Sequence, residues 1–144
     1  MAEKDEIFRI SSLVESLLRR AGEQLVCRGE DLVLALIERS GGACTPGELS
    51  KLACVSTARI AAVLNSLSRK GLVTRCTEHG SGRRTIVSLT SYGRQYAEAI
   101  CRQAEEVLGA FIDYLGDDDT TELVRLLTKA EEFLKKDTGA LSNA

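Results

Sequence analysis

The positive charges of this 144-residue chain are concentrated in one stretch. Residues 56–84 contain six cations and a single anion, Glu78, which gives this stretch a net charge of +5. The cations are Arg59, Arg69, Lys70, Arg75, Arg83 and Arg84. The whole chain carries a net charge of −2, so the residues outside the stretch carry −7. A basic stretch within a mildly acidic chain is the pattern that binding to DNA phosphates favours.

Residues that could support catalysis or hold a metal ion are sparse. His79 is the only histidine, and it falls in an expected loop, where no third group would orient it as a catalytic base. Cys76 and His79 stand three residues apart, but two ligands do not complete a zinc site. The segment 79–82 precedes a strand and not a helix, which argues against a phosphate-binding loop. We therefore expect no enzyme, no metal site and no cofactor.

The five cysteines allow two interpretations. They are Cys27, Cys44, Cys54, Cys76 and Cys101, an odd number without a CxxC pair, so a disulfide framework is not expected. One interpretation is that they are small buried hydrophobic residues that stay reduced. The other is a redox switch, for which Cys54, in the turn between two expected helices, and Cys27, next to Arg28, are the candidates.

Two helices with strong start signals must position the basic residues. Thr45 as N-cap, Pro46 at the first helical position and Glu48 three residues after the cap predict a capping box. Ser56 caps a second helix, in which apolar residues recur at helical spacing. Those residues are Ile60, Val63, Leu64 and Leu67. Gly71 stands where a helix end favours a left-handed residue.

After Gly71 the apolar period changes from that of a helix to that of a strand. Residues 72–77 and 84–89 are typical of the two strands of a hairpin, and residues 78–83 of an irregular loop between them. We therefore expect a helix, a turn, a second helix and a two-stranded wing within residues 45–90, and we call these residues the DNA-reading segment.

The DNA-reading segment resembles the winged-helix domain of the MarR family of bacterial transcription regulators. The resemblance rests on the capped helix at Thr45, the second helix at Ser56, the sequence LSRKGLVTR and the closing VSLTSYGR of residues 87–94. The flanking helices also match the family in order and length. The resemblance implies a winged helix-turn-helix fold, mainly α with a small β-hairpin, and a dimer whose effector varies across the family.

In a helix-turn-helix the second helix enters the major groove and its first residues touch base edges. We expect its outer face to meet DNA, with Arg59 able to bind guanine through two hydrogen bonds and the alanines able to meet thymine methyl groups. That face comprises Ser56, Thr57, Ala58, Arg59, Ala62 and Ser66. The alternative for Arg59 is an ordinary solvated surface charge.

The wing departs from the family pattern at one position. The family commonly has Asp-x-Arg there, with the arginine in the minor groove and the aspartate holding it. Here Ser81, Gly82 and Arg83 occupy that place. The resemblance therefore implies that Arg83 enters the groove without its acidic partner, while Arg84 can take a phosphate.

Two further residues have two possible roles each. Thr45 could bind a phosphate through its hydroxyl and the adjacent amides, or act only as a helix cap. Arg75 could contact a phosphate or form a structural ion pair.

Helices with long apolar stripes are expected on both sides of the DNA-reading segment. They cover residues 5–26, about 30–39, 91–115 and a last stretch that begins at Asp117. Their stripes exceed what one winged helix can bury, so we expect a homodimer formed by residues 1–28 and 91–136. The alternative is that these helices pack only on their own domain.

Length and composition fit a single winged-helix domain of residues 1–144. Hydrophobic residues make up 44% and charged residues 28%, as in ordinary globular proteins. No apolar run approaches the ~20 residues of a membrane helix, and the first residues do not form a signal peptide. We expect a cytoplasmic protein without a membrane partner.

Together these features predict a dimeric, sequence-specific DNA-binding transcription regulator, a repressor that a small-molecule effector releases from a pseudo-palindromic operator. Two alternatives remain open at this point: a cysteine-based redox-sensing repressor, and a winged helix used only for protein interaction. The basic wing argues against the second alternative.

Overall fold

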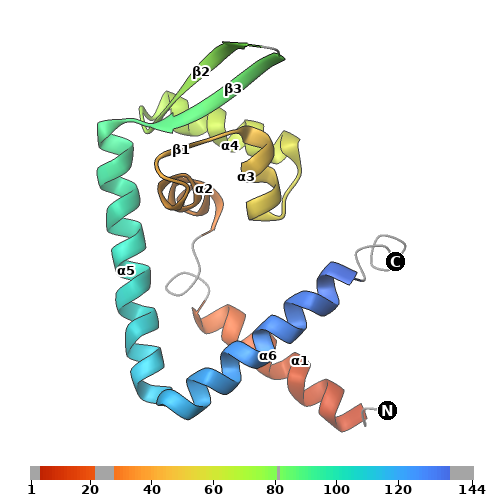
Figure 1. Ribbon diagram of the computed structural model, residues 1–144. Coiled ribbons are helices and arrows are strands. Elements are labelled where there is room, and N and C mark those ends of the chain that lie inside the picture. The colour runs from red at the N-terminus through yellow and green to blue at the C-terminus, as the bar shows by residue number, and fades with distance from the viewer. Residues whose placement is uncertain (1–3, 22–27, 81, 137–144) are drawn as a thin grey trace. The chain divides into compact units, whose positions relative to one another are not determined.

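The computed structural model describes residues 4–21, 28–80 and 82–136 (Figure 1). The chain divides into two compact units, residues 1–105 and residues 106–144. The elements in chain order are α1 (Lys4–Ala21), α2 (Gly29–Arg39), β1 (Ala43–Cys44), α3 (Pro46–Ala53), α4 (Thr57–Arg69), β2 (Val73–Gly80), β3 (Gly82–Leu89), α5 (Ser91–Leu115) and α6 (Asp117–Lys136). The structure thus confirms a mainly α fold with a small sheet.

Most helix ends lie where the sequence places them. The helices α3 and α4 begin at the residues after Thr45 and Ser56, and α5 covers the expected residues 91–115. Gly71, after α4, has the left-handed conformation that the sequence predicts, with φ of +73°. The first expected helix is described as Lys4–Ala21, and its predicted continuation over residues 22–26 falls outside the described part of the chain.

The sheet has three antiparallel strands in the order β1-β3-β2. The central strand β3 pairs with both neighbours, as Cys44 opposite Val87 and Val73 opposite Leu89 show. β1 was not predicted, because a two-residue strand has no period of its own. Its pairing with β3 joins the end of α2 to the hairpin.

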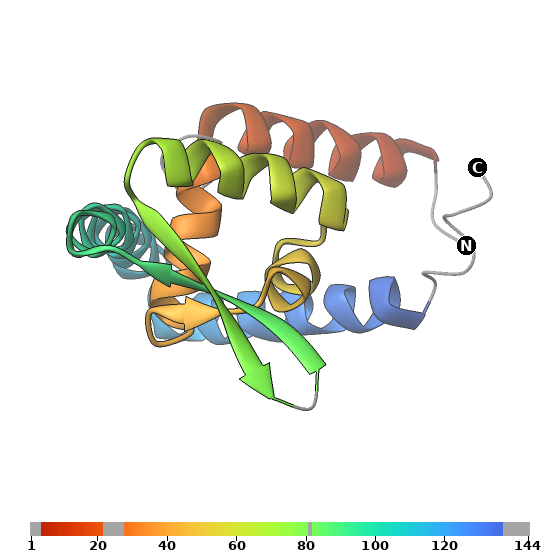
Figure 2. The same ribbon diagram turned by 90° about the horizontal axis from the view of Figure 1, so that it is seen from above.

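The hairpin is longer than the sequence predicts. Of the residues predicted as an irregular loop, 78–80, 82 and 83 lie in the strands; pairing continues outward through Glu78 opposite Arg84 and His79 opposite Arg83, as far as Gly80 opposite Gly82. The prediction was wrong because these residues are polar or glycine and have little strand preference, whereas ladder hydrogen bonds use only the backbone. The β2–β3 hairpin extends past α2, α3 and α4 (Figures 1 and 2).

The apolar core of the first unit lies between α2, α3, α4 and the sheet. Its largest side chains are exposed by less than 2%. They are Leu34, Ile37, Leu49, Ile60, Leu64, Leu67 and Val87. Each helix contributes the apolar residues that recur at helical spacing in its sequence. Because these residues are buried, the opposite face of α4 is turned outward.

The first turn of α5 is packed closely against the winged helix. The Thr90 hydroxyl donates to the carbonyl of Gly71 over 2.7 Å, and the amide of Gly93 donates to the same hydroxyl over 2.9 Å. A Cβ atom added to Gly93 would lie 1.8 Å from the carbonyl oxygen of Leu72, so only glycine fits there. Arg94 forms an ion pair of 3.7 Å with Glu38 at the end of α2.

The helices α1 and α6 leave their apolar stripes exposed. In α1, Phe8 is 76% exposed and Leu17 is 61% exposed. In α6, Leu127 and Phe133 are about as exposed, and no residue of that helix is buried. No helix in the described ranges has the length and apolar character needed to cross a membrane.

Candidate nucleic-acid interface

The start of α3 is held by the predicted capping box. The Thr45 hydroxyl accepts from the Glu48 amide over 3.2 Å, and the Thr45 amide donates to the Glu48 carboxylate over 2.8 Å. The same hydroxyl donates its hydrogen to that carboxylate over 3.0 Å. Because a threonine hydroxyl has one hydrogen, a phosphate could receive it from Thr45 only in place of Glu48.

The carboxylate of Glu48 also reaches the wing. Arg84 lies 3.7 Å from its second oxygen. The hydrogen bonds from Thr45, with a smaller contribution from the charge of Arg84, lower the pKa of Glu48 below its ordinary value. Arg84, expected to take a phosphate, therefore has a carboxylate partner on α3 that a phosphate would have to replace.

The turn between α3 and α4 presents the first residues of α4 to solvent. Cys54 ends α3 in the left-handed conformation, with φ of +53°. The Ser56 hydroxyl accepts from the Arg59 amide over 3.2 Å, which confirms the cap and leaves the hydroxyl hydrogen of Ser56 able to donate. Thr57, Ala58 and Arg59 are all exposed, as binding by the start of α4 requires.

The outward face of α4 differs in part from the one expected. Ala58 and Ala62 are exposed on the side opposite the core, and the same stripe continues through Asn65 and Arg69. Asn65 was not predicted on this outward face, although its distance of three positions from Ala62 is the helical signal that places it there. Ser66, expected on this face, is half-buried and hydrogen-bonds Glu30 of α2 instead.

Arg75 has a neutral partner in place of the ion pair considered above. Its Nη2 atom donates to Oδ1 of Asn65 over 2.8 Å, which joins the start of β2 to the outward face of α4. The guanidinium keeps its charge and its other donors. This contact spans ten positions in sequence, so neither the helical nor the strand period could have indicated it.

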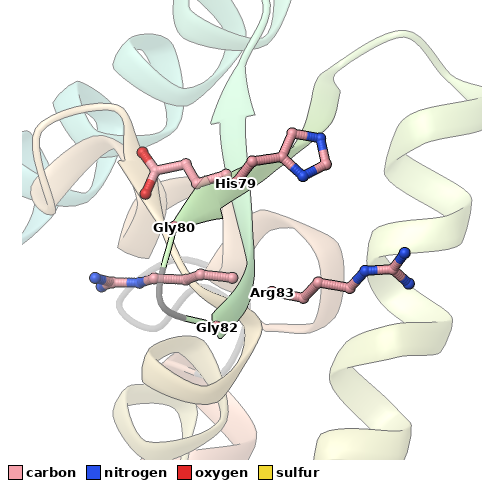
Figure 3. Close-up of a pocket in the computed structure, with 6 residues that line it drawn as sticks. His79, Gly80, Gly82 and Arg83 are labelled. Atoms are coloured by element: carbon pink, nitrogen blue, oxygen red, sulfur yellow. The ribbon is translucent and has the colours of Figure 1, made fainter.

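The wing carries Arg83 near its tip. Figure 3 shows His79 and Arg83 extending to the same side of the hairpin, as expected for residues opposite each other in the ladder. No carboxylate among the described residues pairs with the guanidinium of Arg83. Gly80 and Gly82, at the end of the hairpin, carry no side chain that would keep the wall of a DNA groove away from Arg83.

The six cations of residues 56–84 therefore have different surroundings. Lys70 is bound to Glu30 of α2, which lowers the pKa of that carboxyl group, and Arg84 is paired with Glu48. The other four form no ion pair within the part of the chain that is described, although the charge of Arg69 acts on the Glu30 carboxylate at longer range. These four, Arg59, Arg69, Arg75 and Arg83, are called the unpaired arginines below. Positive charge without a fixed counter-ion is what a polyanion can neutralise.

The described cysteines and possible metal ligands form no second site. Burial, with the charge of Glu48, raises the pKa of Cys44 to about 11, so its thiol stays protonated. Cys54 and Cys76 are exposed, and Cys27, the other redox candidate, lies outside the described residues. No disulfide joins the described cysteines. Within the same residues, no three histidine, cysteine or acidic side chains are grouped as a metal would require.

Comparison with known proteins finds the same fold in solved structures. Residues 32–84 match the sequence model of the MarR family. The structure is similar to that of Streptococcus pneumoniae FabT in complex with DNA, with a TM-score of 0.78 and 21% identity over 90% of this chain and 98% of that one. Among proteins with curated functions, none matches the sequence significantly.

Two other solved structures show the same arrangement of elements. A mutant MarR from E. coli complexed with operator DNA aligns with a TM-score of 0.72 and 23% identity, over 90% of this chain and 99% of that one. NadR in complex with 4-hydroxyphenylacetate aligns with a TM-score of 0.65 and 22% identity, over 90% of this chain and 93% of that one.

Proposed function

We propose that this chain, whose residues 32–84 match the MarR family model and whose fold is similar to that of FabT, is a DNA-binding transcription regulator of that family. The observation that carries the proposal is the set of four unpaired arginines on α4, β2 and β3. A chain with a net charge of −2 that leaves these four without carboxylate partners is suited to a polyanion. The similar FabT and MarR structures, which contain DNA, support the same assignment.

The proposed docking places α4 in the major groove and the wing in the adjacent minor groove. Arg59, in the first turn of α4, reads a base edge, and Arg83 enters the minor groove. The other proposed contacts are Thr45, Ser56, Thr57, Ala58, Ala62, Arg75 and Arg84. Of these, Thr45 and Arg84 must exchange their bonds to Glu48 for a phosphate.

The functional form that we propose is a homodimer. Exposed apolar stripes on α1 and α6, with Leu108 and Ile112 of α5 more than 40% exposed, need a partner surface. A second copy of the chain supplies it with two-fold symmetry, and two reading heads then fit a pseudo-palindromic site. Light scattering at micromolar concentration should give about twice the 15.6 kDa of the chain; a clean monomer would refute the dimer.

We further propose that the regulator is a repressor released by a small molecule. The similarity to NadR in complex with 4-hydroxyphenylacetate supports this kind of effector. The ligand need only bind better to a dimer whose recognition helices have the wrong spacing for DNA. A difference of ~1.4 kcal/mol in its binding free energy to the two spacings shifts the equilibrium between them tenfold.

A salt titration of DNA binding tests the central proposal. Protein is mixed with duplex DNA, and the dissociation constant is measured at increasing salt by fluorescence anisotropy. Affinity should fall linearly on logarithmic axes, because bound phosphates release counter-ions. Absence of binding, or affinity that does not change with salt, would favour a winged helix that serves protein interaction only.

Selection of bound sequences from a random duplex library then identifies the operator. We expect two half-sites with centres about 10–10.5 bp apart. Five base pairs inserted between them would turn the half-sites to opposite sides of the duplex and abolish tight binding. Affinity indifferent to this spacing would contradict docking of two heads.

A further inference from the structure

An open hollow lies between the C-terminal half of α4 and the start of β2, apart from the first turn of α4. It is lined by Asn65, Ser68, Arg69, Val73, Thr74 and Arg75. No carboxylate lines it, and all but Val73 are exposed. Two of the four unpaired arginines, Arg69 and Arg75, therefore meet at one place on the DNA-reading segment.

The bond between Arg75 and Asn65 determines what this hollow can bind. A guanidinium group has only donors, so the Asn65 atom that lies 2.8 Å from Arg75 must be the amide oxygen. The amide nitrogen, with its two hydrogens, is then the free end of the side chain. This bond occupies one of the two lone pairs of the oxygen and fixes the orientation of the amide, so the amide nitrogen is the group that is left to donate to a ligand.

The polar groups of the hollow are thus mainly donors. The Asn65 amide, the guanidinium groups of Arg69 and Arg75 and the Ser68 hydroxyl can all donate, and two of these groups carry a fixed positive charge. Charge-assisted donors of this kind bind phosphate oxygens better than neutral groups. Lys70, next to Arg69, does not share this role, because its amine is bound to Glu30 of α2.

We propose that this hollow is a second anchoring site of the reading head, which binds one phosphate of the DNA backbone beside the groove that α4 enters. The proposal rests on the proposed function and adds Asn65, Ser68 and Arg69 to its contacts. Arg75 acts in it as a phosphate ligand that Asn65 holds in place. This site fixes the position of α4 along the duplex and does not itself read bases.

The test compares variants of the whole protein on a random-sequence duplex of about 30 bp, where affinity depends on phosphate contacts. Arg69→Gln should lower the slope of log affinity against log salt by about 0.9, the contribution of one phosphate. Lys70→Gln is the matched control, since it removes the same charge from the adjacent position but outside the hollow. Its slope should equal that of the wild type.

Asn65→Asp separates a phosphate ligand from a merely structural residue. The aspartate keeps an oxygen for Arg75, so a purely structural role would leave affinity unchanged. A phosphate site instead loses a donor and gains a negative charge, and affinity should fall on the order of tenfold. Circular dichroism confirms that each variant is folded, and Asn65→Ser, which removes the donor without adding charge, should give a smaller loss.

Three outcomes would overturn the inference while leaving the proposed function intact. One is salt-dependent binding by the wild type with an unchanged slope in Arg69→Gln. Another is wild-type affinity in Asn65→Asp. The third is a combination of two results: inorganic phosphate shifts the NMR signal of the Asn65 side-chain amide, but the hollow variants keep full DNA affinity. Absence of salt-dependent binding by the wild type would instead refute the proposed function itself.

Discussion

Arg59 and Arg83 form no ion pair among the described residues, and their places suit them to different proposed contacts with DNA. Arg59 lies in the first turn of α4, three residues after the exposed cap at Ser56. A side chain there reaches base edges when the helix enters a major groove. Arg83 lies near the end of the hairpin, next to Gly82 and opposite His79 in the ladder. A minor groove would attract it there by its narrowness and potential more than by its bases.

Substitution of each arginine by alanine should therefore have a different signature. Arg59→Ala should cost ~1–3 kcal/mol of binding free energy and relax base preference at one position of each half-site. Arg83→Ala should weaken binding to all sequences by a similar factor. The measurement is affinity for the selected operator and for its single-base variants. Equal, sequence-independent losses in both variants would show that Arg59 does not read a base.

At the scale of single residues, Gly93 has the strictest steric requirement. A Cβ atom at this position would lie 1.8 Å from the Leu72 carbonyl oxygen, which also accepts the amide hydrogen of Thr90. Gly93→Ala must push the first turn of α5 away from the winged helix. We expect it to lower the free energy of unfolding by about 1–3 kcal/mol or more.

Gly47→Ala is the control for that prediction. Gly47 also lies in the first turn of a helix, but a Cβ atom there would meet nothing within 4 Å. Alanine should raise the unfolding free energy by about 0.4–1 kcal/mol, since it restricts the unfolded chain without a clash. Both values come from urea unfolding at one protein concentration. Similar effects of the two substitutions would contradict the close packing at Gly93.

At the scale of elements, two carboxylates connect helices and strands that are distant in sequence. Glu48 connects the start of α3 to Arg84 of β3, and Glu30 connects α2 to Lys70 at the end of α4. Hydrogen bonds lower the pKa of both groups in the folded chain, from Thr45 in the first case and chiefly from Lys70 in the second. These contacts fix the wing and α4 relative to the core.

The lowered pKa values predict how stability depends on pH. Each group is more acidic in the folded state than its ordinary value of 4.5, so its contribution is present above that pH and is lost as the pH falls through the folded-state value. The unfolding free energy of the wild type should therefore fall on acidification below about 4.5. Glu48→Gln should be less stable at neutral pH and show a shallower acid dependence.

A chemical denaturation series at several pH values, at fixed protein concentration, measures this dependence. Glu78→Gln provides the matched control, because the carboxylate of Glu78 forms neither an ion pair nor a hydrogen bond with any residue in the described ranges. This control variant should follow the wild-type curve more closely. An acid dependence identical in Glu48→Gln and the wild type would show that the capping carboxylate does not contribute.

At the scale of the whole molecule, regulation can reach DNA through two routes. A small molecule would shift the proposed dimer between spacings of its recognition helices. A difference of ~3 kcal/mol in its binding free energy to the two spacings changes the equilibrium more than a hundredfold. An oxidised cysteine would do the same through a new covalent group. The structure makes Cys44 unsuited to the second route, because burial keeps its thiol protonated.

We expect mild peroxide to leave DNA affinity unchanged. The experiment compares the wild type with a variant in which all five cysteines are serine, each with and without peroxide. An added single variant, Cys54→Ser, examines the exposed residue that ends α3 beside the recognition helix. If peroxide weakens the wild type and spares the cysteine-free variant, the protein is a redox sensor and the small-molecule effector is wrong.

The sequence by itself determined the elements whose hydrogen bonds are local. The capping box at Thr45, the cap at Ser56, the left-handed Gly71 and the extent of α5 all follow from residues three or four positions apart. Groups so close along the chain meet whatever the rest of the molecule does, since closing such a short loop costs little entropy. The concentration of positive charge in residues 56–84 was also visible, because it is a property of one continuous segment.

Only the tertiary structure decided which cations are paired and how far the wing extends. Arg75 meets Asn65, Lys70 meets Glu30 across 40 positions, and Arg84 meets Glu48. The short strand β1 likewise exists only because β3 lies beside it. Such contacts depend on how α2, α3 and the hairpin pack around one core, and no period of a single segment specifies a partner from another element. The core determines which arginines remain unpaired, and with them the place where DNA is proposed to bind.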